Sequence, residues 1–397
     1  MGKSKNDDFA AQLIKSLNKD FKTKVAYNLS EDESPTHVKS WISTGSNLLN
    51  YICANQAGGG MPVGRIVEIF GPPSIGKSHI ATQIARSTQQ RGGIVVYIDT
   101  ENATSIENLG NLGVDVSTRF VYVDTHCTEE VLDIAEKTIL KAKALDKDIP
   151  VTVIWDSVAA SSPKAELLGD YDKETIGLQA RAISKGMRKI TGIIGQTNSL
   201  LICLNQVKTK IGVLYGDPDT VPGGKAIPFH ASIRIKLGGG QQIKDANGDV
   251  IGVKCWAKTV KNKVAPPFRK VDFEIHFGKG IDETESMFDL LRKHGPVVKD
   301  GIEYEIGGNG SWKSISKLDL STEPASLIDS KKFYKKDFKE IINSTEWKDA
   351  VNIILDDAMV KKMSSEEGID INPDSYTEVS ALGDMLGGDD FDESDLQ

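Results

Sequence analysis

The residues with the clearest chemical potential form a glycine-rich loop near residue 75. The stretch 71–78 has the GxxxxGK[ST] spacing, in which glycines let backbone N–H groups curl around a phosphate. An apolar run at 66–70 precedes it and a helical pattern at 77–91 follows it, which is the strand–loop–helix setting that this motif requires. The motif therefore predicts a nucleotide phosphate site formed by Gly71, Pro72, Pro73, Ser74, Ile75, Gly76, Lys77 and Ser78.

Two of these residues and one later acid predict a magnesium–nucleotide site. Lys77 is expected to reach the β- and γ-phosphates of a bound nucleotide, and the Ser78 hydroxyl is expected to bind Mg²⁺. Asp156 ends the apolar run 151–155, where a carboxylate can hold the Mg²⁺ shell. Any strand can end in Asp, but a place downstream of a phosphate loop favours the metal interpretation. A nucleotide with β- and γ-phosphates and Mg²⁺ are thus expected to bind here, with Ser78 and Asp156 at the metal.

Polar residues also follow two other apolar runs. Asp99 and Glu101 end the run at 94–98 and point the same way from an extended segment, so one of them can polarise the water that attacks the γ-phosphate. The alternative is a helix-capping or loop acid. Asn205 and Gln206 end the run at 200–204, where an amide can sense the γ-phosphate. Its alternative is an ordinary amide at the start of a loop.

Two glycine-bearing loops and a basic helix face predict contacts with phosphodiesters. The loops are 169–177 and 207–227, and the second is long enough to be functional or disordered rather than a simple connector. Basic residues follow the first loop at helical spacing, namely Arg181, Lys185, Arg188 and Lys189. The alternative is a solvated face without a partner.

Composition is typical of a globular protein without a membrane partner. The 397 residues are 39% hydrophobic and 26% charged, with no run of eighteen apolar residues and no apolar core of a signal peptide. The four cysteines, Cys53, Cys127, Cys203 and Cys255, lie far apart, which disfavours structural zinc and a disulfide framework. A reducing cytosol fits this cysteine usage, so the predicted location is the cytoplasm.

The net charge of −8 hides an uneven distribution. Residues 364–397 carry eleven acids and no Lys or Arg, and without them 48 basic residues face 45 acidic ones. A mildly basic body can bind nucleic acid if its charge is concentrated in one groove. The acidic tail is expected to compete for a basic surface, such as the lysine cluster at 331–339, unless it only aids solubility.

The order of the expected elements predicts an α/β fold. Apolar, β-rich runs lie at 66–70, 94–98, 120–123, 151–155, 200–204 and 230–237, and the helical patterns 77–91, 129–144 and 178–194 separate most of the early ones. Strands that alternate with helices favour a doubly wound, mostly parallel sheet. Later strands are expected at 253–260 and 271–277, with a hairpin turn at Asn247-Gly248.

The chain is expected to divide into four parts. Residues 1–40 hold a helix at 9–21, a short strand at 24–29 and a linker, a unit that can cap its own domain or serve oligomerisation by docking on another subunit. Residues 41–280 form the ATPase core with its loops, 281–363 a small α+β C-terminal domain, and 364–397 a disordered acidic tail. No internal repeat is apparent.

These motif blocks resemble the bacterial-type RecA recombinase family over roughly residues 7–340. They follow in the family's order: Ser43–Ser46, Gly64–Gly71, Ile98–Ala103, Asp156–Ala160, Ser162–Glu166, Leu204–Val213, the Gly223-Gly224 pair and Val260–Phe268. The resemblance implies a RecA-type ATPase core and ATP-dependent polymerisation on single-stranded DNA. It also implies DNA-stimulated hydrolysis, and pairing and strand exchange with homologous double-stranded DNA. Single-strand binding and mediator proteins are further expected partners.

The resemblance also assigns roles to single residues. Glu101 would orient the attacking water, and Gln206 would couple the γ-phosphate to the DNA loop. Lys261 and Lys263 would reach the ATP of the adjacent subunit, Phe229 would relay across that interface, and the N-terminal helix and strand would pack on a neighbouring subunit of a helical filament. The expected DNA contacts are Arg181, Arg188, Lys208, Ile211, Gly223 and Gly224.

The chain departs from the family pattern at several of these places. Pro228 stands where bacterial members carry an interface lysine, and Asn108 where an aromatic ring stacks on adenine. Gly238 and Gly239 replace an arginine pair that serves the second DNA strand, and Trp256 replaces another basic residue there. A divergent member, such as one carried by a virus and acting in the host cytoplasm, fits these changes.

Two other functions fit parts of the sequence. A hexameric helicase or branch-migration motor shares the phosphate loop, but the helix–strand arm suits filaments and no N-terminal zinc-binding cysteine set is present. A non-enzymatic accessory protein is disfavoured by intact Lys77, Ser78, Glu101 and Asp156. Electron microscopy with ATP and single-stranded DNA separates the three as a helical filament, a closed ring or neither.

Overall fold

The computed structural model describes most of the chain between residues 7 and 360. The described residues are 7–22, 24–30, 34, 36–170, 177–209, 219–294, 298–300, 303–306, 331–333, 335–344, 355–356 and 358–360. Their helices are α1 (Asp7–Asp20), α2 (Asn47–Ala54), α3 (Lys77–Gln90), α4 (Ile106–Asn111), α5 (Thr128–Leu145), α6 (Lys164–Leu167), α7 (Leu178–Thr197), α8 (Ala226–His230), α9 (Thr284–His294) and α10 (Phe338–Asn343). None of the described helices is long and apolar enough to cross a bilayer.

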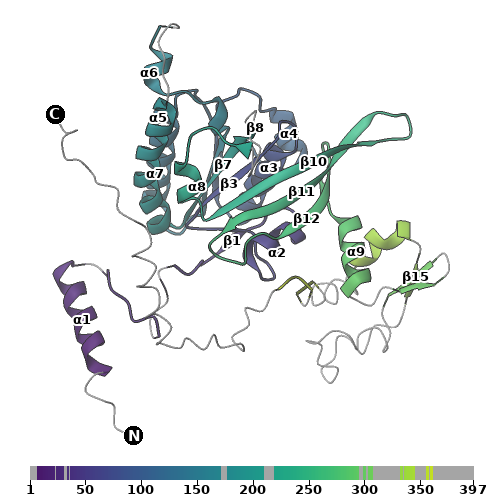
Figure 1. Ribbon diagram of the computed structural model, residues 1–397, viewed down its shortest axis with the longest axis horizontal. Helices are drawn as coiled ribbons and strands as arrows, with labels where there is room; N and C mark the ends of the chain where they lie inside the picture. The colour runs from purple at the N-terminus through teal and green to yellow at the C-terminus, as the bar shows by residue number, and fades with distance from the viewer. Residues whose placement is uncertain are drawn as a thin grey trace, which may run out of the picture. The chain divides into compact units, whose positions relative to one another are not determined.

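One large sheet organises the fold. Within the described residues it has nine strands in the order β13-β12-β11-β10-β3-β7-β6-β4-β5 (Figure 1). Their bounds are β3 (Ile66–Gly71), β4 (Ile94–Asp99), β5 (Phe120–Asp124), β6 (Val151–Asp156), β7 (Ser199–Gln206), β10 (Ile233–Lys244), β11 (Val250–Asn262), β12 (Lys270–His276) and β13 (Gly280–Asp282). Neighbours from β10 to β5 pair in parallel, while β11, β12 and β13 add antiparallel strands. The predicted mostly parallel α/β fold is confirmed.

The other strands form small sheets. The strand β1 (Trp41–Ile42) pairs with β2 (Met61–Pro62), and β8 (Lys208–Thr209) pairs with β9 (Asp219–Thr220). A three-stranded sheet joins β14 (Val298–Asp300), β15 (Glu303–Ile306) and β16 (Lys331–Phe333). The β8–β9 pair closes the base of the predicted DNA loop 207–227, because it joins Lys208 to Thr220 across the loop.

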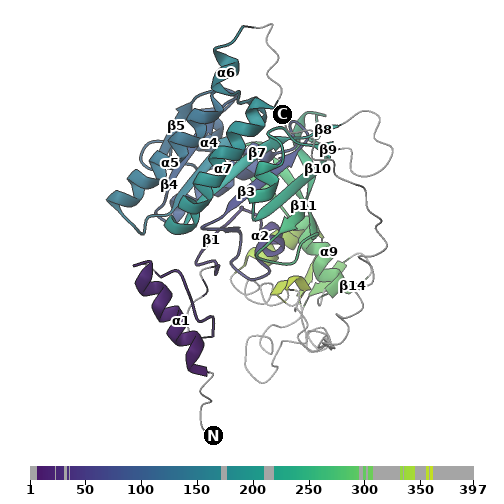
Figure 2. The same cartoon turned by 60° about the vertical axis from the view of Figure 1, so that its left-hand side comes forward.

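Alternating side chains of the central strands fill a hydrophobic core on each face of the sheet. Val67 and Ile69 of β3 pack in one cluster with residues of α2 and α3, while Ile66 packs in the other with residues of α5 and α7. Figure 2 shows α5 and α7 side by side. Burial on both faces explains the continuous apolar runs. Parallel strands end at one edge, so β3, β4, β6 and β7 bring their polar terminal residues together there.

The predicted strand at 24–29 is wrong. Its described residues form an extended segment and a turn, with no strand assigned. The side-chain amide of Asn18 holds this segment instead: Oδ1 accepts from the N–H groups of Val25 and Ala26 at 2.7 and 2.9 Å, and Nδ2 donates to the Ala26 carbonyl. A strand needs a partner strand for its hydrogen bonds, and the polar groups here are bonded locally.

The predicted strand at 230–237 starts late, whereas the predicted hairpin is confirmed. His230 ends helix α8, and β10 begins only at Ile233. The β10–β11 ribbon turns at Asp245, whose carbonyl accepts from the Gly248 N–H at 3.1 Å. Gly248 has φ +90°, a conformation that favours glycine.

The described part of the predicted C-terminal domain shares the core of the ATPase body. Phe288 of α9 and Phe338 of α10 belong to the same hydrophobic cluster as Val67 and Ile69. Lys339 pairs with Asp282 at 2.6 Å, and Lys335 pairs with Glu285. The described residues, which extend to Val360, group as one compact unit. The division into four parts stays a prediction, and the acidic tail lies outside the described residues.

Candidate active site and nucleic-acid interface

The phosphate loop runs from the end of β3 to the first turn of α3. Gly71 must be a glycine, because a Cβ atom there would lie 2.6 Å from the Leu237 carbonyl oxygen. Gly76 has φ +100°, and its added Cβ would lie 2.1 Å from Cδ1 of Ile275. The unpaired N–H groups at the start of α3 favour an anion. The loop is therefore shaped for a phosphate, as the motif predicts.

Lys77 lies folded over the loop. Its Nζ donates to the carbonyl oxygens of Gly71 and Pro72 at 3.1 and 2.7 Å. Burial lowers the pKa of Lys77, while the nearby carboxylates of Asp156 and Glu101 act to raise it. A phosphate in the loop would replace these carbonyl contacts with charged ones, which favours binding of an anionic ligand.

Asp156 and Ser78 lie next to each other beneath the loop. Asp156 ends β6, is buried, and accepts from the Tyr97 hydroxyl at 2.6 Å. Burial raises its pKa, whereas hydrogen bonds from Tyr97 and Ser78 act to lower it. A hydroxyl and a carboxylate are oxygen ligands of the kind that Mg²⁺ takes beside nucleotide phosphates. The residues present therefore fit a magnesium ion.

The structure gives different surroundings to Asp99, which ends β4, and to Glu101, which follows two residues later. Asp99 accepts from the N–H groups of Glu101 and Thr104 and from the Tyr122 hydroxyl at 2.9–3.0 Å. Although burial raises the pKa of Asp99, these hydrogen bonds outweigh it and leave the pKa lowered. Asp99 thus fixes the local backbone, and Glu101 remains the candidate to orient water.

Glu101 is held by two donors. Gln206 Nε2 donates to its Oε1 at 2.9 Å, and the Ser157 hydroxyl donates to the same oxygen. Gln206 ends β7 directly beside Gly71 of β3, and the N–H of the next residue, Val207, donates to the Gly71 carbonyl at 3.3 Å. The predicted sensor amide therefore joins the phosphate loop, the candidate catalytic carboxylate and the start of the 207–227 loop.

A cavity of about 270 Å³ continues from these residues toward Asn108. Its lining includes His79 and Phe277, which the sequence analysis missed. Burial lowers the pKa of His79 to about 4, so its imidazole is neutral, and its Nε2 is buried without a hydrogen-bond partner among the described residues. Phe277 directly follows β12 and its ring is 55% exposed. In the sequence, Phe277 is the last residue of the predicted strand 271–277, so no local signal pointed to the nucleotide site.

The predicted intersubunit residues gather away from the phosphate loop. Lys261 lies on β11 in register with Arg234 of β10, and its Nζ donates to the carbonyls of Pro228 and Phe229 at 2.7 and 2.9 Å. The Phe229 ring is 72% exposed. Lys263 follows the end of β11 and lines a second cavity, of about 1020 Å³, that is remote from the phosphate loop.

Some of the predicted DNA-binding residues lie close together in the structure. Gly223 and Gly224 have positive φ, and added Cβ atoms would lie within 3 Å of Ile183 and Ala180 of α7. The exposed Arg181 lies between those two helix positions, so the glycine pair and the basic helix are neighbours. Exposed side chains also include Arg188 and Lys208. Ile211 lies outside the described residues.

One basic residue of α7 and two residues of the β10–β11 ribbon have structural contacts of their own. Lys189 pairs with Glu136 of α5 at 2.8 Å, so this lysine also ties α7 to α5. At the ribbon, an added Cβ on Gly238 would lie 2.1 Å from Cζ2 of Trp256. The tryptophan thus fills the space that a side chain at 238 would need, which makes the two departures from the family pattern physically linked.

The strand order and the site define a phosphate-loop ATPase in which β7, the strand that ends in Gln206, lies beside the loop-bearing strand β3. Residues 9–282 match the RecA N-terminal domain family. The chain is 43% identical over 273 residues to Protein RecA of Syntrophus aciditrophicus. The aligned region covers 68% of this chain and 77% of that protein. It is 40% identical over 285 residues to Protein RecA of Bacteroides thetaiotaomicron, with coverages of 71% and 83%.

A third relative, Protein RecA of Geobacter sulfurreducens, is 39% identical over 314 residues, or 78% of this chain and 89% of that protein. The chain therefore belongs to the RecA family. It is a recombinase and a DNA-dependent ATPase, which binds ATP and DNA and forms filaments. The family assignment favours this function over a hexameric motor or an inactive accessory protein.

Proposed function

We propose that Lys77 and the loop 71–78 bind the ATP phosphates, that Ser78 and Asp156 hold Mg²⁺, and that Glu101 orients the attacking water. The observation that carries the proposal is the 2.9 Å hydrogen bond from Gln206 to Glu101. Gln206 and Ser157 both donate to Oε1, so they hold the carboxylate in one orientation and leave Oε2 as its acceptor for water. A γ-phosphate that draws Gln206 away would free Glu101. This exchange gives a physical reason for hydrolysis that depends on the DNA loop.

The adenine base is proposed to lie against Phe277. Asn108 occupies the position at which the family pattern has an aromatic residue that stacks on adenine. Asn108 and Phe277 both line the 270 Å³ cavity that also includes Ser78. A large exposed ring supplies the apolar face that a base requires. Phe277 therefore offsets the missing aromatic at 108.

Hydrolysis is proposed to require a neighbouring subunit. Lys261 and Lys263 lie apart from the phosphate loop of their own chain, and positive charge supplied in trans stabilises phosphoryl transfer. The apolar side chains of α1 support such assembly: Phe9 is 70% exposed and Leu13 49% exposed. Apolar residues at this spacing suit packing on a second copy.

Single-stranded DNA is the proposed primary partner, with homologous duplex as the second partner and the cytoplasm as the place of action. The proposed primary site combines Arg181, Arg188, Lys208 and the Gly223-Gly224 amides. For the duplex, the ribbon offers lysines in register across three strands, Lys236, Lys258 and Lys270, which supply positive charge in place of the arginine pair. Single-strand binding and mediator proteins are proposed further partners.

Binding of single-stranded DNA should depend steeply on salt and only slightly on sequence. The proposed contacts are cationic side chains and backbone amides, which bind phosphates and release counterions. Titration of fluorescent oligonucleotides of different sequence between about 50 and 200 mM salt measures both properties. An affinity that is flat with salt, or a strong preference for one motif, would contradict the proposed site.

Imaging and turnover together test the proposed function. Electron microscopy with ATP and single-stranded DNA should show helical filaments, and the same DNA should stimulate ATP hydrolysis. Chelation of Mg²⁺ should stop ATP hydrolysis, and addition of Mg²⁺ should restore it. Turnover that is unaffected by DNA, or that survives chelation, would contradict the assigned site.

A further inference from the structure

Glu68 is a carboxylate in the middle of the hydrophobic core. It lies on β3 between Val67 and Ile69 and is 0% exposed. A buried charge is costly unless it is paired and hydrogen-bonded. Glu68 has two such partners on the flanking strands: Arg234 Nε of β10 donates to Oε2 at 2.5 Å, and Asn205 Nδ2 of β7 donates to Oε1 at 3.1 Å.

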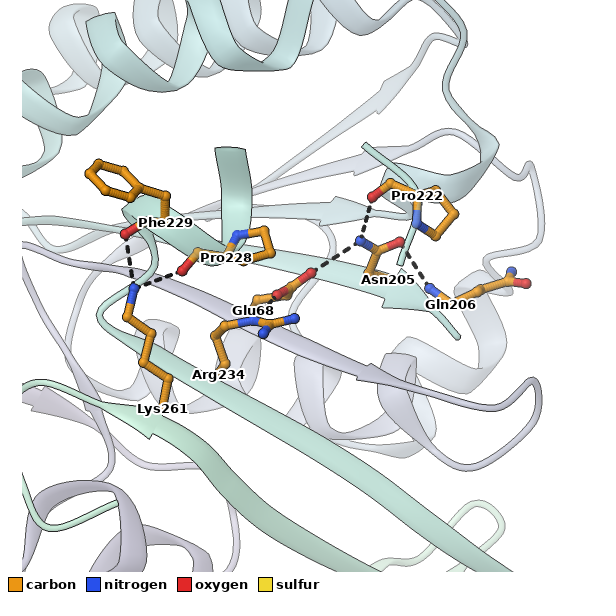
Figure 3. A network of polar contacts seen from close by, with 8 residues as sticks. All are labelled: Glu68, Asn205, Gln206, Pro222, Pro228, Phe229, Arg234 and Lys261. Carbon is orange, nitrogen blue, oxygen red and sulfur yellow. Dashed lines mark hydrogen bonds and ion pairs between the residues drawn. The ribbon is translucent and has the colours of Figure 1, made fainter. Parts of the chain in front are cut away.

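The Asn205 side leads to the catalytic edge. Its Nδ2 also donates to the Pro222 carbonyl at 3.1 Å, at the end of the 207–227 loop, and its Oδ1 accepts from the Gln206 N–H at 3.0 Å. Gln206 in turn contacts Glu101. Asn205 is therefore the point where the DNA loop, the sensor strand and Glu68 meet (Figure 3).

The Arg234 side leads to the intersubunit residues. Arg234 stacks on Phe70, with its guanidinium carbon 4.6 Å from the ring centroid, and stands in register with Lys261. Burial lowers the pKa of Lys261, Lys263 and Arg234 lower it further, and Glu68 acts to raise it. In Figure 3, Lys261 and Gln206 lie at opposite ends of the network, with Glu68 between them.

We propose that Glu68 is a positioning residue that couples the DNA loop and sensor strand of one subunit to Lys261, and through Lys261 to ATP hydrolysis in the adjacent subunit. This inference rests on the proposed roles of Gln206 and Lys261. A movement of Pro222 or Gln206 alters the hydrogen bonds of Asn205. Because Asn205 also binds Glu68, the positions of Glu68 and of its partner Arg234 then change. Lys261 then exchanges the carbonyls of Pro228 and Phe229 for the phosphate of the neighbouring ATP.

A purely structural ion pair is the competing explanation. Apolar residues of similar volume commonly replace such a pair without loss of stability. If Glu68 and Arg234 serve only to fill the core, removal of both charges should therefore leave function intact. If they position Lys261, removal of both charges should restore stability but not coupling.

The test uses full-length protein with Glu68→Gln, which keeps the size of the side chain and one acceptor. Stimulation of ATP hydrolysis by single-stranded DNA should fall by about 10-fold, a typical coupling between two sites. DNA-free turnover, affinity for a fluorescent ATP analogue and filament formation should stay within about twofold, since Glu68 touches none of the reacting groups. The matched control, Glu274→Gln, removes the Lys254–Glu274 pair on β11 and β12 and should change none of these readouts.

Two further samples make the result decisive. The double variant Glu68→Leu/Arg234→Met, which replaces the pair by apolar side chains, should keep the melting temperature of the parent while its DNA stimulation is low; full stimulation in this variant would overturn the proposal. In filaments that mix Glu68→Gln with Glu101→Gln subunits, DNA-stimulated turnover should return, because the Glu68→Gln subunit then faces an intact Lys261. No recovery in verified mixed filaments would place the defect in its own site and overturn the proposal.

Lys261→Ala separates this inference from the proposed function. If Lys261→Ala loses stimulated turnover while Glu68→Gln keeps it, the coupling role of Glu68 is wrong and the role of Lys261 stands. If Lys261→Ala keeps stimulated turnover, the proposed role of the lysine itself is wrong.

Discussion

Replacement of Glu101 by Gln is expected to lower DNA-stimulated ATP hydrolysis by about 10²-fold or more, a typical loss when a general base is removed. The amide keeps the size of the side chain and an oxygen that can accept from Ser157. It lacks the charge and the basicity that align and polarise water. Binding of ATP and of single-stranded DNA should be retained, because phosphate and Mg²⁺ contacts come from Lys77, Ser78 and Asp156.

Steady-state hydrolysis with and without DNA, together with binding of a fluorescent ATP analogue, measures this effect. Glu107→Gln is the matched control, since Glu107 is an exposed acid in the first turn of α4 and should have no influence on turnover. Near-normal hydrolysis by the Glu101→Gln protein would defeat the assignment of the water-orienting residue.

Replacement of Lys77 by Ala should lower hydrolysis by about 10²–10³-fold, the usual cost of removing one charged donor from a developing anion. The Lys77 ammonium donates to the Gly71 and Pro72 carbonyls, so it lies at the phosphate loop itself. Unlike Glu101→Gln, this change should also weaken ATP binding, and with it ATP-dependent filament formation.

Lys77→Arg serves as the charge-preserving comparison. Its forked guanidinium does not match a site shaped for a compact ammonium, so it should retain more nucleotide binding than Lys77→Ala but little turnover. Equal ATP affinity in the parent and in the Lys77→Ala protein would show that the loop does not use this lysine.

The phosphate site could be predicted from the sequence because its signals are local. The loop 71–78 carries its own glycines, lysine and serine, and the runs that end in Asp156 and Gln206 are strands of one parallel sheet. Strands of such a sheet end at the same edge, so the order of the runs was enough to bring these residues together.

Choices that depend on tertiary neighbours could not be made from the sequence. Asp99 and Glu101 share a face and a charge, and only Thr104 and Tyr122 show that Asp99 is a structural acceptor. The segment at 24–29 has a strand-like composition but no partner strand among the described residues. Phe277 follows β12, which is remote in sequence from the phosphate loop, so no local pattern linked the two.

The sequence contains a signal for the buried ion pair of Glu68 that the sequence analysis did not use. It is the single charged residue in the apolar run 66–70, at a position where both faces of the strand are buried. A charge in such a run requires partners from other strands. The sequence alone could not say that these partners are Asn205 and Arg234.

Each hydrolytic site is proposed to be completed by Lys261 of an adjacent subunit. Filaments that mix Lys261→Ala and Glu101→Gln subunits on single-stranded DNA test it most directly, because each variant alone should be nearly inactive. In the mixture, a Lys261→Ala subunit whose ATP faces a Glu101→Gln neighbour has both an intact Glu101 and an intact Lys261. Hydrolysis should therefore return in the mixture. Mixed filaments, verified by labelling, that stay as inactive as either variant alone would show that Lys261 does not act across the subunit interface.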